Sequence, residues 1–194
     1  MLNKSEILKI FKDSGVLKKG HFILASGRHA SQYMQMAQAT QDAKITELLC
    51  QNLADNFKNA KIDVVVSPAV GGLIVGYEMS RILGTRNLFT ERDNDEMTLR
   101  RGFSIKPGER VLVVEDVVTT GGSVKEVIRV VEEAGGEVVG VAVLVDRSNG
   151  KVDFGYPFVA LLSLEIISYP ADECPLCAAG ELPAVKPGSR NKSQ

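Results

Sequence analysis

Two adjacent acids and a glycine-rich turn follow one short apolar run, and this arrangement is the most chemically informative feature of the chain. Residues Val111–Val114 are apolar and mostly β-branched, which predicts a buried strand. Glu115 and Asp116 come next, at the carboxyl end of that strand, where open α/β sheets bind their ligands. Residues 119–123, Thr-Thr-Gly-Gly-Ser, then predict a tight, hydroxyl-rich turn that leads into a helix.

The turn and the acids suit different parts of one ligand. Backbone N–H groups of residues 119–123 and the N-terminus of the following helix form a site for a phosphate monoester. Because carboxylates repel phosphate, Glu115 and Asp116 must face sugar hydroxyls, a metal or a developing carbocation. Together they predict a sugar-phosphate pocket. The simpler alternatives are a solvated corner, a plain turn, and a capping box made by Ser123 and Glu126.

A second glycine turn follows another predicted strand, in the segment Ser-Pro-Ala-Val-Gly-Gly-Leu at residues 67–73. It has neither the Walker A sequence nor the dinucleotide-binding spacing. Gly71 and Gly72 would let backbone N–H groups approach a second anion, although the turn could instead serve only to pack a helix. Two anion sites at the ends of two strands fit a substrate that is phosphorylated at both ends.

The elements that position these residues alternate between strand and helix. Strands are predicted at 62–67, 86–91, 110–115, 138–145 and 157–162, helices at 5–12, 42–59, 71–83 and 121–134, and two short strands within 20–36. This order predicts an α/β fold whose parallel-sheet core has helices on both faces. Residues 91–105 are charged and lack periodicity, so we expect a long loop, and such loops are often functional lids.

Length and composition limit the class of protein. The 194 residues, 44% apolar and 24% charged, fit a single domain with a hood mainly at 1–40, a core at about 41–167, and a C-terminal tail at 168–194 that frays at its end. A net charge of −1 argues against nucleic acid as a partner. Without an apolar run of the ~20 residues that span a bilayer, or a signal peptide, we expect no membrane association and a cytoplasmic location.

The order of residues 111–123 resembles the phosphoribosyl pyrophosphate (PRPP) motif of the type I phosphoribosyltransferases, and residues 67–73 stand where that family has its pyrophosphate loop. The resemblance implies that Glu115 and Asp116 bind the ribose hydroxyls and favour developing positive charge, which makes them catalytic candidates. It also implies Mg²⁺, held mainly through the substrate. The implied PRPP-binding residues are Glu115, Asp116, Val117, Val118, Thr119, Thr120, Gly121, Gly122, Ser123, Gly71, Gly72 and Arg92.

Nearly the whole chain resembles the orotate branch of this family. Residues 24–28 followed by Tyr33 and Met34 resemble its hood strand, and Arg147 stands where its members bind the orotate carboxylate, a task suited to a bidentate guanidinium. The implied orotate-binding residues are Thr119, Arg147, Tyr33 and Met34. The implied reaction makes orotidine 5′-monophosphate and pyrophosphate in pyrimidine biosynthesis. The alternatives are a purine phosphoribosyltransferase and a non-catalytic PRPP-sensing regulator.

The lid departs from the pattern of the family. Orotate enzymes typically carry lysines and a histidine in a lid that reaches the partner subunit's site, which implies a homodimer. Residues 91–101 of this chain contain neither residue type. Arg92 aligns with the lid arginine of the family and is a catalytic candidate, and Arg100 and Arg101 are candidates to replace the lysine. In the hood, Ala25 stands where many orotate enzymes have lysine.

The pair Cys174 and Cys177 has the spacing of metal ligands or of a redox pair. A structural zinc site needs about four ligands. The chain has no second cysteine pair, and His21 and His29 are distant in sequence. A site shared across a dimer, a labile disulfide and plain packing therefore stay open, and plain packing is the favoured interpretation.

Overall fold

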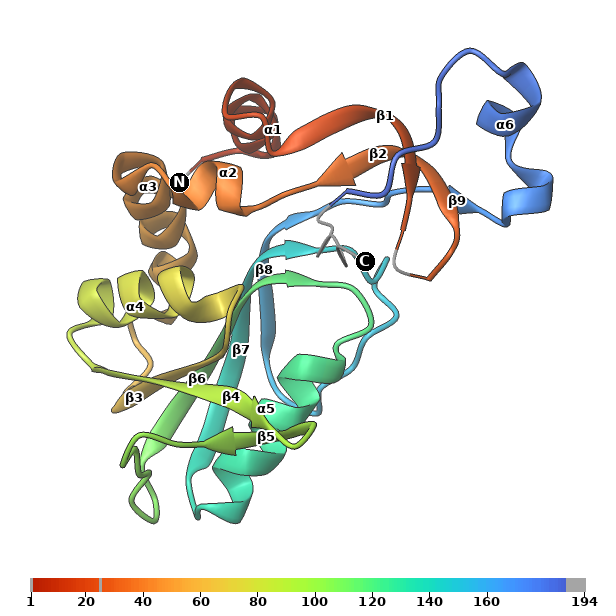
Figure 1. Ribbon diagram of the computed structural model, residues 1–194. Helices are drawn as coiled ribbons and strands as arrows, with labels where there is room; N and C mark the ends of the chain where they lie inside the picture. The colour runs from red at the N-terminus through yellow and green to blue at the C-terminus, as the bar shows by residue number, and fades with distance from the viewer. Residues whose placement is uncertain (1, 25, 188–194) are drawn as a thin grey trace.

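The computed structural model describes residues 2–24 and 26–187, which form two sheets (Figure 1). The larger sheet has six strands in the order β5-β4-β3-β6-β7-β8. Its strands are β3 (Val64–Pro68), β4 (Arg86–Asp93), β5 (Glu96–Leu99), β6 (Arg110–Val118), β7 (Glu137–Asp146) and β8 (Phe158–Ser163). All neighbours pair in parallel except β4 and β5. The predicted parallel core is confirmed, with one antiparallel edge strand added.

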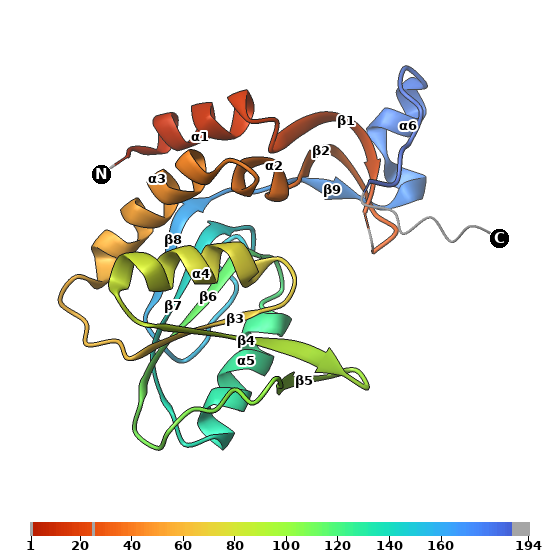
Figure 2. The ribbon, with the colours of Figure 1, turned by 60° about the vertical axis from the view of Figure 1, so that its left-hand side comes forward.

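Helices cover both faces of this sheet, as predicted (Figure 2). α3 (Ala43–Ala54) and α4 (Gly72–Leu83) lie on one face, and α5 (Gly122–Glu133) lies on the other. The strand residues alternate accordingly: Leu112 and Val114 belong to the core beneath α3 and α4, whereas Val111 and Val113 belong to the core beneath α5. In the described part of the chain, no helix is both long and apolar enough to span a membrane.

The smaller sheet, called the hood sheet here, combines the two ends of the chain. It consists of β1 (Leu17–Ile23), β2 (His29–Met34) and β9 (Ser168–Tyr169), with β9 antiparallel to β2. α1 (Lys4–Asp13) and α2 (Ala37–Thr40) flank it, and a 3₁₀ turn (Ala171–Glu173) and α6 (Pro175–Ala179) follow β9. Figure 1 shows this blue C-terminal segment beside β1 and β2. The polar end of the tail, predicted to fray, lies outside the described residues.

Residues 91–99 are not part of a long loop, and this expectation is wrong. β4 continues to Asp93, turns through Asn94 and Asp95, and returns as β5. Both turn residues have positive φ, 49° and 69°, as a two-residue hairpin turn requires and as Asn and Asp tolerate. Met97 is buried beneath the hairpin, which anchors it. The dense charge of the segment obscured these signals in the sequence.

Candidate active site

Glu115 and Asp116 end β6 in a confined space rather than at a solvated corner. Glu115 is only 7% exposed. The Asp116 N–H donates to Glu115 Oε1 at 3.1 Å, and the Val117 N–H donates to Asp116 Oδ1 at 2.7 Å. Burial and the neighbouring Asp116 charge raise the pKa of Glu115, and burial also raises the pKa of Asp116. The pair therefore favours holding a proton until a ligand with hydroxyl donors or positive charge arrives.

The turn at residues 119–123, called the phosphate turn here, encloses a cavity of about 60 Å³ beside the acid pair. Gly121 caps α5 with a φ of +76°, and a Cβ there would come within 2.8 Å of Val152 Cγ1. No side chain among the described residues caps this helix, so its first N–H groups are available to a ligand. The lining residues are Glu115, Val117, Val118, Thr119, Thr120, Gly121, Gly122, Ser123 and Val124.

The alternative capping box of Ser123 and Glu126 is wrong. α5 begins at Gly122, so Ser123 lies inside the first turn instead of at the cap. The Glu126 carboxylate accepts a hydrogen bond from the Arg92 guanidinium at 2.6 Å. A lid residue therefore contacts the helix that carries the phosphate turn.

The second glycine turn meets the acid pair because β3 and β6 are parallel neighbours. A Cβ on Gly71 would lie 2.9 Å from Asp116 Oδ1, and one on Gly72 would lie 3.1 Å from Glu115 Oε1. Only glycine leaves this space between backbone and carboxylates open. The structure thus brings the second glycine turn to the acids and the phosphate turn, which lie more than 40 positions later in the sequence.

A larger cavity of about 640 Å³, called the hood cavity here, lies between the hood sheet and the large sheet. Thr119 and Thr120 line both this cavity and the smaller cavity at the phosphate turn, so the two spaces are adjacent. Its volume is in the range of small-molecule sites. The lining residues are Ile23, Leu24, Ser26, Tyr33, Thr119, Thr120, Arg147, Ser168 and Pro187.

Arg147 supplies positive charge to the hood cavity. It follows β7 directly, and its backbone N–H donates to the Val118 carbonyl at 2.7 Å, which ties it to the end of β6. Its Nε is buried and has no hydrogen-bond partner among the described residues. Burial lowers the pKa of this guanidinium. A buried, unpartnered guanidinium nitrogen is costly, and an anionic ligand in the cavity would satisfy it.

Sequence reasoning missed the contribution of the C-terminal segment to the hood cavity. Arg28 Nε donates to Ser168 Oγ at 2.9 Å and an Arg28 terminal nitrogen donates to the Ser168 carbonyl at 2.6 Å, which fixes β9 to the turn after β1. Ser168 and Pro187 line the cavity from the far end of the chain. No local pattern marks either residue, because both reach the cavity through hood-sheet pairing. Ala25 lies outside the described residues.

Two groups of predicted site residues lie elsewhere. Met34 is buried in the core beneath α3 and α4 and does not line the hood cavity as described. The lid arginines are engaged by carboxylates instead of by the acid pair: Arg92 binds Glu126 at 2.6 Å, Arg101 binds Glu91 at 3.0 Å, and Arg100 lies 3.8 Å from Asp93.

A still larger hollow, of about 970 Å³, is not the functional site. It opens between α1, α2 and the start of α3, and residues such as Asp13, Gln38 and Lys44 line it. It contains neither glycine turn and no buried acid. The convergence of acids, turns and an arginine with a buried Nε therefore identifies the site better than cavity size does.

Comparison with known proteins gives a consistent result. Residues 35–174 match the family described as Phosphoribosyl transferase domain. The chain is 57% identical over 189 residues to an orotate phosphoribosyltransferase of Desulforamulus reducens, covering 97% of this chain and 98% of that protein. It is 54% identical to one from Caldanaerobacter subterraneus, covering 97% and 99%. The crystal structure of the Aeropyrum pernix orotate phosphoribosyltransferase aligns with a TM-score of 0.69 at 27% identity, covering 81% of this chain and 93% of that one.

Proposed function

This chain belongs to the orotate phosphoribosyltransferases, and we propose that its phosphate turn, acid pair and hood cavity form one active site that joins PRPP to orotate. The products are orotidine 5′-monophosphate and pyrophosphate. The observation that carries the assignment is that the two cavities adjoin at Thr119 and Thr120, with Glu115 lining one and Arg147, whose Nε is buried, lining the other.

The reaction is a displacement at the anomeric carbon of PRPP, and its transition state has oxocarbenium character. The phosphate turn binds the 5′-phosphate, which places the ribose beside the acid pair. The ribose hydroxyls donate hydrogen bonds to Glu115 and Asp116, whose negative charge then stabilises the developing cation. Because burial raises the pKa of both acids, ligand binding and proton loss from the pair are coupled.

Orotate occupies the hood cavity in this proposal. Its carboxylate pairs with Arg147, the described lining residue whose guanidinium nitrogen is buried without a partner. Pairing restores the hydrogen bond that burial removed and aligns the planar base. Thr119 lies between the two substrates, and Tyr33 closes the hood side of the cavity.

Mg²⁺ is part of the proposal, and the donor chemistry of the site fits it. The carboxylate oxygens of Glu115 and Asp116 lie close to Gly72 and Gly71, so a hydrated cation held by substrate phosphates would meet favourable charge beside this turn. Mg²⁺ would neutralise the pyrophosphate leaving group. The backbone of the second glycine turn supplies N–H groups to the same pyrophosphate oxygens.

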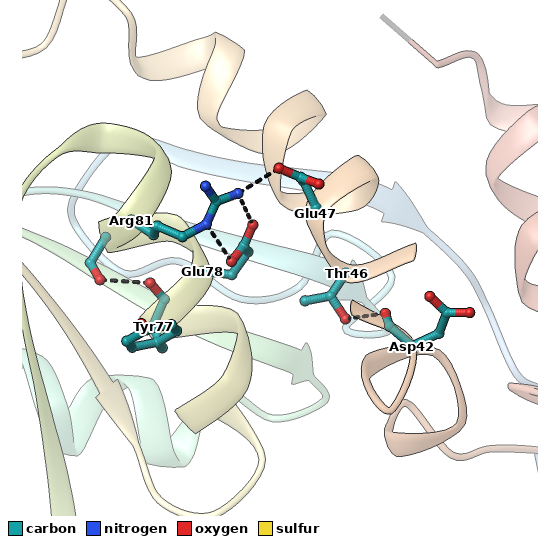
Figure 3. Close-up of polar contacts among 7 residues, drawn as sticks. Asp42, Thr46, Glu47, Tyr77, Glu78 and Arg81 are labelled. Carbon is teal, nitrogen blue, oxygen red and sulfur yellow. Dashed lines mark hydrogen bonds and ion pairs between the residues drawn. The ribbon is translucent and has the colours of Figure 1, made fainter. Parts of the chain in front are cut away.

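A homodimer completes the proposed enzyme. On the outer side of α4, beside the second glycine turn, Val70 is 80% exposed, Ile74 49% and Tyr77 61%. The adjacent surface is polar, because Arg81 joins Glu78 and Glu47 across α4 and α3 (Figure 3). An apolar patch with a polar border suits a second copy of the chain. Since the lid arginines do not reach the acids of their own chain, the dimer would bring them to the partner's site.

The cellular setting follows from the reaction and the cysteines. The product belongs to pyrimidine nucleotide biosynthesis, and we propose a cytoplasmic location. Cys50, Cys174 and Cys177 are all free thiols in the structure, which suits a reducing compartment.

One assay separates the candidate functions. The purified protein is incubated with PRPP, Mg²⁺ and orotate, adenine, hypoxanthine or guanine, and nucleotide formation is followed. We expect a nucleotide only from orotate and only with divalent metal present. Turnover of a purine would overturn the proposed base specificity, and PRPP binding without any turnover would favour the non-catalytic regulator.

A further inference from the structure

A cluster of metal-ligating side chains lies outside the active site, at the junction of the hood sheet and the C-terminal segment. His21 and His29 come from β1 and β2, and Cys174 and Cys177 come from the N-cap and interior of α6. Their ligand atoms all lie within 4.8 Å of one another. We propose that these four residues form a structural Zn²⁺ site that fastens the C-terminal segment to the hood sheet.

The distances match a tetrahedral site. Bond lengths of about 2.3 Å for Zn–S and about 2.05 Å for Zn–N imply ligand separations of about 3.5 Å for S···N and about 3.3 Å for N···N. His21 Nε2 lies 3.6 Å from each sulfur, and His29 Nδ1 lies 3.3 Å from Cys177 Sγ. The two histidine nitrogens are 2.8 Å apart, so an ion must separate this pair by about half an ångström, and the most widely spaced ligand atoms, which are up to 4.8 Å apart, must approach one another by about 1 Å.

The hydrogen bonding of His21 orients it for metal binding. Its Nδ1 lies 3.1 Å from the carbonyl oxygen of Leu182, which can only accept a hydrogen bond. Nδ1 therefore carries the proton, and Nε2 presents its lone pair to the cluster. An outer hydrogen bond of this kind is what fixes the tautomer of zinc-binding histidines.

Burial and ligand type favour zinc in a structural role. His21, His29 and Cys174 are buried, whereas the exposed Cys177 leaves an access route for the ion. Two imidazoles and two thiolates suit Zn²⁺, while Mg²⁺ prefers oxygen ligands. Four protein ligands fill a tetrahedron and leave no position for a substrate. All four come from one chain, so no sharing across a dimer is needed.

The site would control the shape of the hood cavity. The backbone of Val185 bonds to His21 and Ile23, so the segment after α6 runs beside β1. Ser168 and Pro187, just outside the segment that the metal holds, both line the hood cavity. Release of the metal should therefore loosen the orotate end of the active site more than the PRPP end. This functional consequence rests on the proposed function, whereas the metal site itself does not.

Metal content gives the direct test. The full-length protein is expressed in zinc-supplemented medium and desalted, and its zinc content is measured by inductively coupled plasma mass spectrometry. We expect about one zinc per chain in the wild type. We expect none in Cys174→Ser with Cys177→Ser, and a strong reduction in His21→Gln, which keeps both thiols. The control Cys50→Ala removes the remaining, buried cysteine and should keep the zinc.

Spectroscopy and stability complete the test. Replacing zinc with Co²⁺ should give a thiolate-to-cobalt charge-transfer band in the wild type and in Cys50→Ala but not in the double variant. Chelation should lower the Tm of the wild type by about 5 °C or more, and added Zn²⁺ should restore it. In the active enzyme, chelation followed by Mg²⁺ replenishment should raise KM for orotate more than KM for PRPP.

The proposal fails if the wild type contains no zinc and its Tm does not respond to added Zn²⁺, or if Cys174 and Cys177 form a disulfide in the purified protein. Zinc content and Tm are independent of turnover. A zinc-loaded protein that does not use orotate would therefore overturn the proposed function and leave the metal site standing.

Discussion

At the scale of single residues, the active site holds charged groups in environments that do not stabilise the ligand-free protein. Glu115 and Asp116 are adjacent acids in a confined space, and Arg147 has a buried nitrogen without a partner. Each arrangement is unfavourable until the ligand of opposite character binds. This pattern is expected of groups selected for binding and catalysis, and it predicts opposite effects of substitution on stability and on activity.

Asp116→Asn should retain the fold and lose most of its turnover. The residue ends a strand, and an amide can keep its backbone hydrogen bond but not its charge. Loss of one transition-state electrostatic contact lowers kcat by about 10²–10³-fold. Steady-state kinetics with a circular dichroism check measures this, and the surface variant Asp13→Asn is the matched control. Near-normal kcat in folded Asp116→Asn would remove the charge-stabilising role.

Arg147→Ala should raise KM for orotate much more than KM for PRPP. Loss of the partner of a desolvated carboxylate costs about 2–5 kcal/mol, which is about 30-fold or more in affinity. Because Nε has no partner in the free protein, Tm should not fall. Arg147→Lys keeps the charge but lacks the planar guanidinium. Its KM for orotate should therefore lie between that of the wild type and that of Arg147→Ala. Equal effects on both substrates would make Arg147 a structural residue.

Glu115→Gln should stabilise the free protein in a pH-dependent way. Burial and the Asp116 charge raise the folded-state pKa of Glu115 from 4.5 to about 9. The protonated Glu115 side chain therefore makes its full contribution to the free energy of unfolding below pH 4.5, and this contribution is lost as the pH rises toward 9. Gln cannot ionise, so the Tm advantage of the variant should grow between about pH 5 and about pH 9. A constant difference across that range would contradict the burial of this charge.

At the scale of elements, the turns at the ends of β3 and β6 are built around glycine for steric reasons. Gly121 needs a positive φ and also faces Val152 and Phe154 closely, whereas Gly108 has a positive φ of 78° but no atom within 4 Å of a built Cβ. A comparison of alanine substitutions at Gly121 and Gly108 therefore distinguishes the effect of backbone strain from the effect of steric crowding.

Gly121→Ala should be clearly more destabilising than Gly108→Ala. Both variants carry the strain of a left-handed residue, about 1–2 kcal/mol, and only Gly121→Ala adds about 1–3 kcal/mol of overpacking. Urea unfolding measures the difference. Since the clash displaces the phosphate turn, Gly121→Ala should also weaken PRPP binding, whereas Gly108→Ala should not. Equal destabilisation would show that the crowding at Gly121 relaxes without consequence.

At the scale of the whole molecule, we propose that a second copy of the chain completes the active site. The acids and both glycine turns belong to one sheet edge, but the lid arginines are held by Glu91, Asp93 and Glu126. A dimer through the exposed side of α4 would supply the missing cations in trans. Exposed ion pairs contribute little to stability, so the lid can exchange its carboxylate partners for phosphate oxygens.

Mixing two inactive variants tests this sharing. Asp116→Asn lacks a functional acid pair, and the triple variant of Arg92, Arg100 and Arg101 to Ala lacks the lid cations. In a mixed dimer one of the two sites has an intact pocket and an intact lid, so part of the activity should return. Each parent must first be shown to be nearly inactive and able to exchange subunits. No recovery under those conditions would place the lid over its own site.

The sequence by itself determined the features that depend on residues close together in the chain. The strand at 111–114, the acids behind it and the glycine turn are contiguous, and the alternating strands and helices predict the parallel core that carries them. The one local prediction that was wrong is the long loop expected at residues 91–105. The hairpin found there depends on the turn at Asn94 and Asp95 and on the burial of one side chain, Met97, and a short signal of this kind is lost among so many charges.

Only the tertiary structure decided which distant segments meet. His21 and Cys174 are 153 positions apart, and Arg28 and Ser168 are 140 apart. Their proximity depends on β9 pairing with β2 and on the C-terminal segment returning along β1. Such contacts leave no periodicity in the sequence, because they are stabilised by the sum of long-range pairing and burial and not by any local preference. The same long-range packing buried Glu115 and left Arg147 Nε without a hydrogen-bond partner among the described residues, and these environments give the two residues their expected roles in binding.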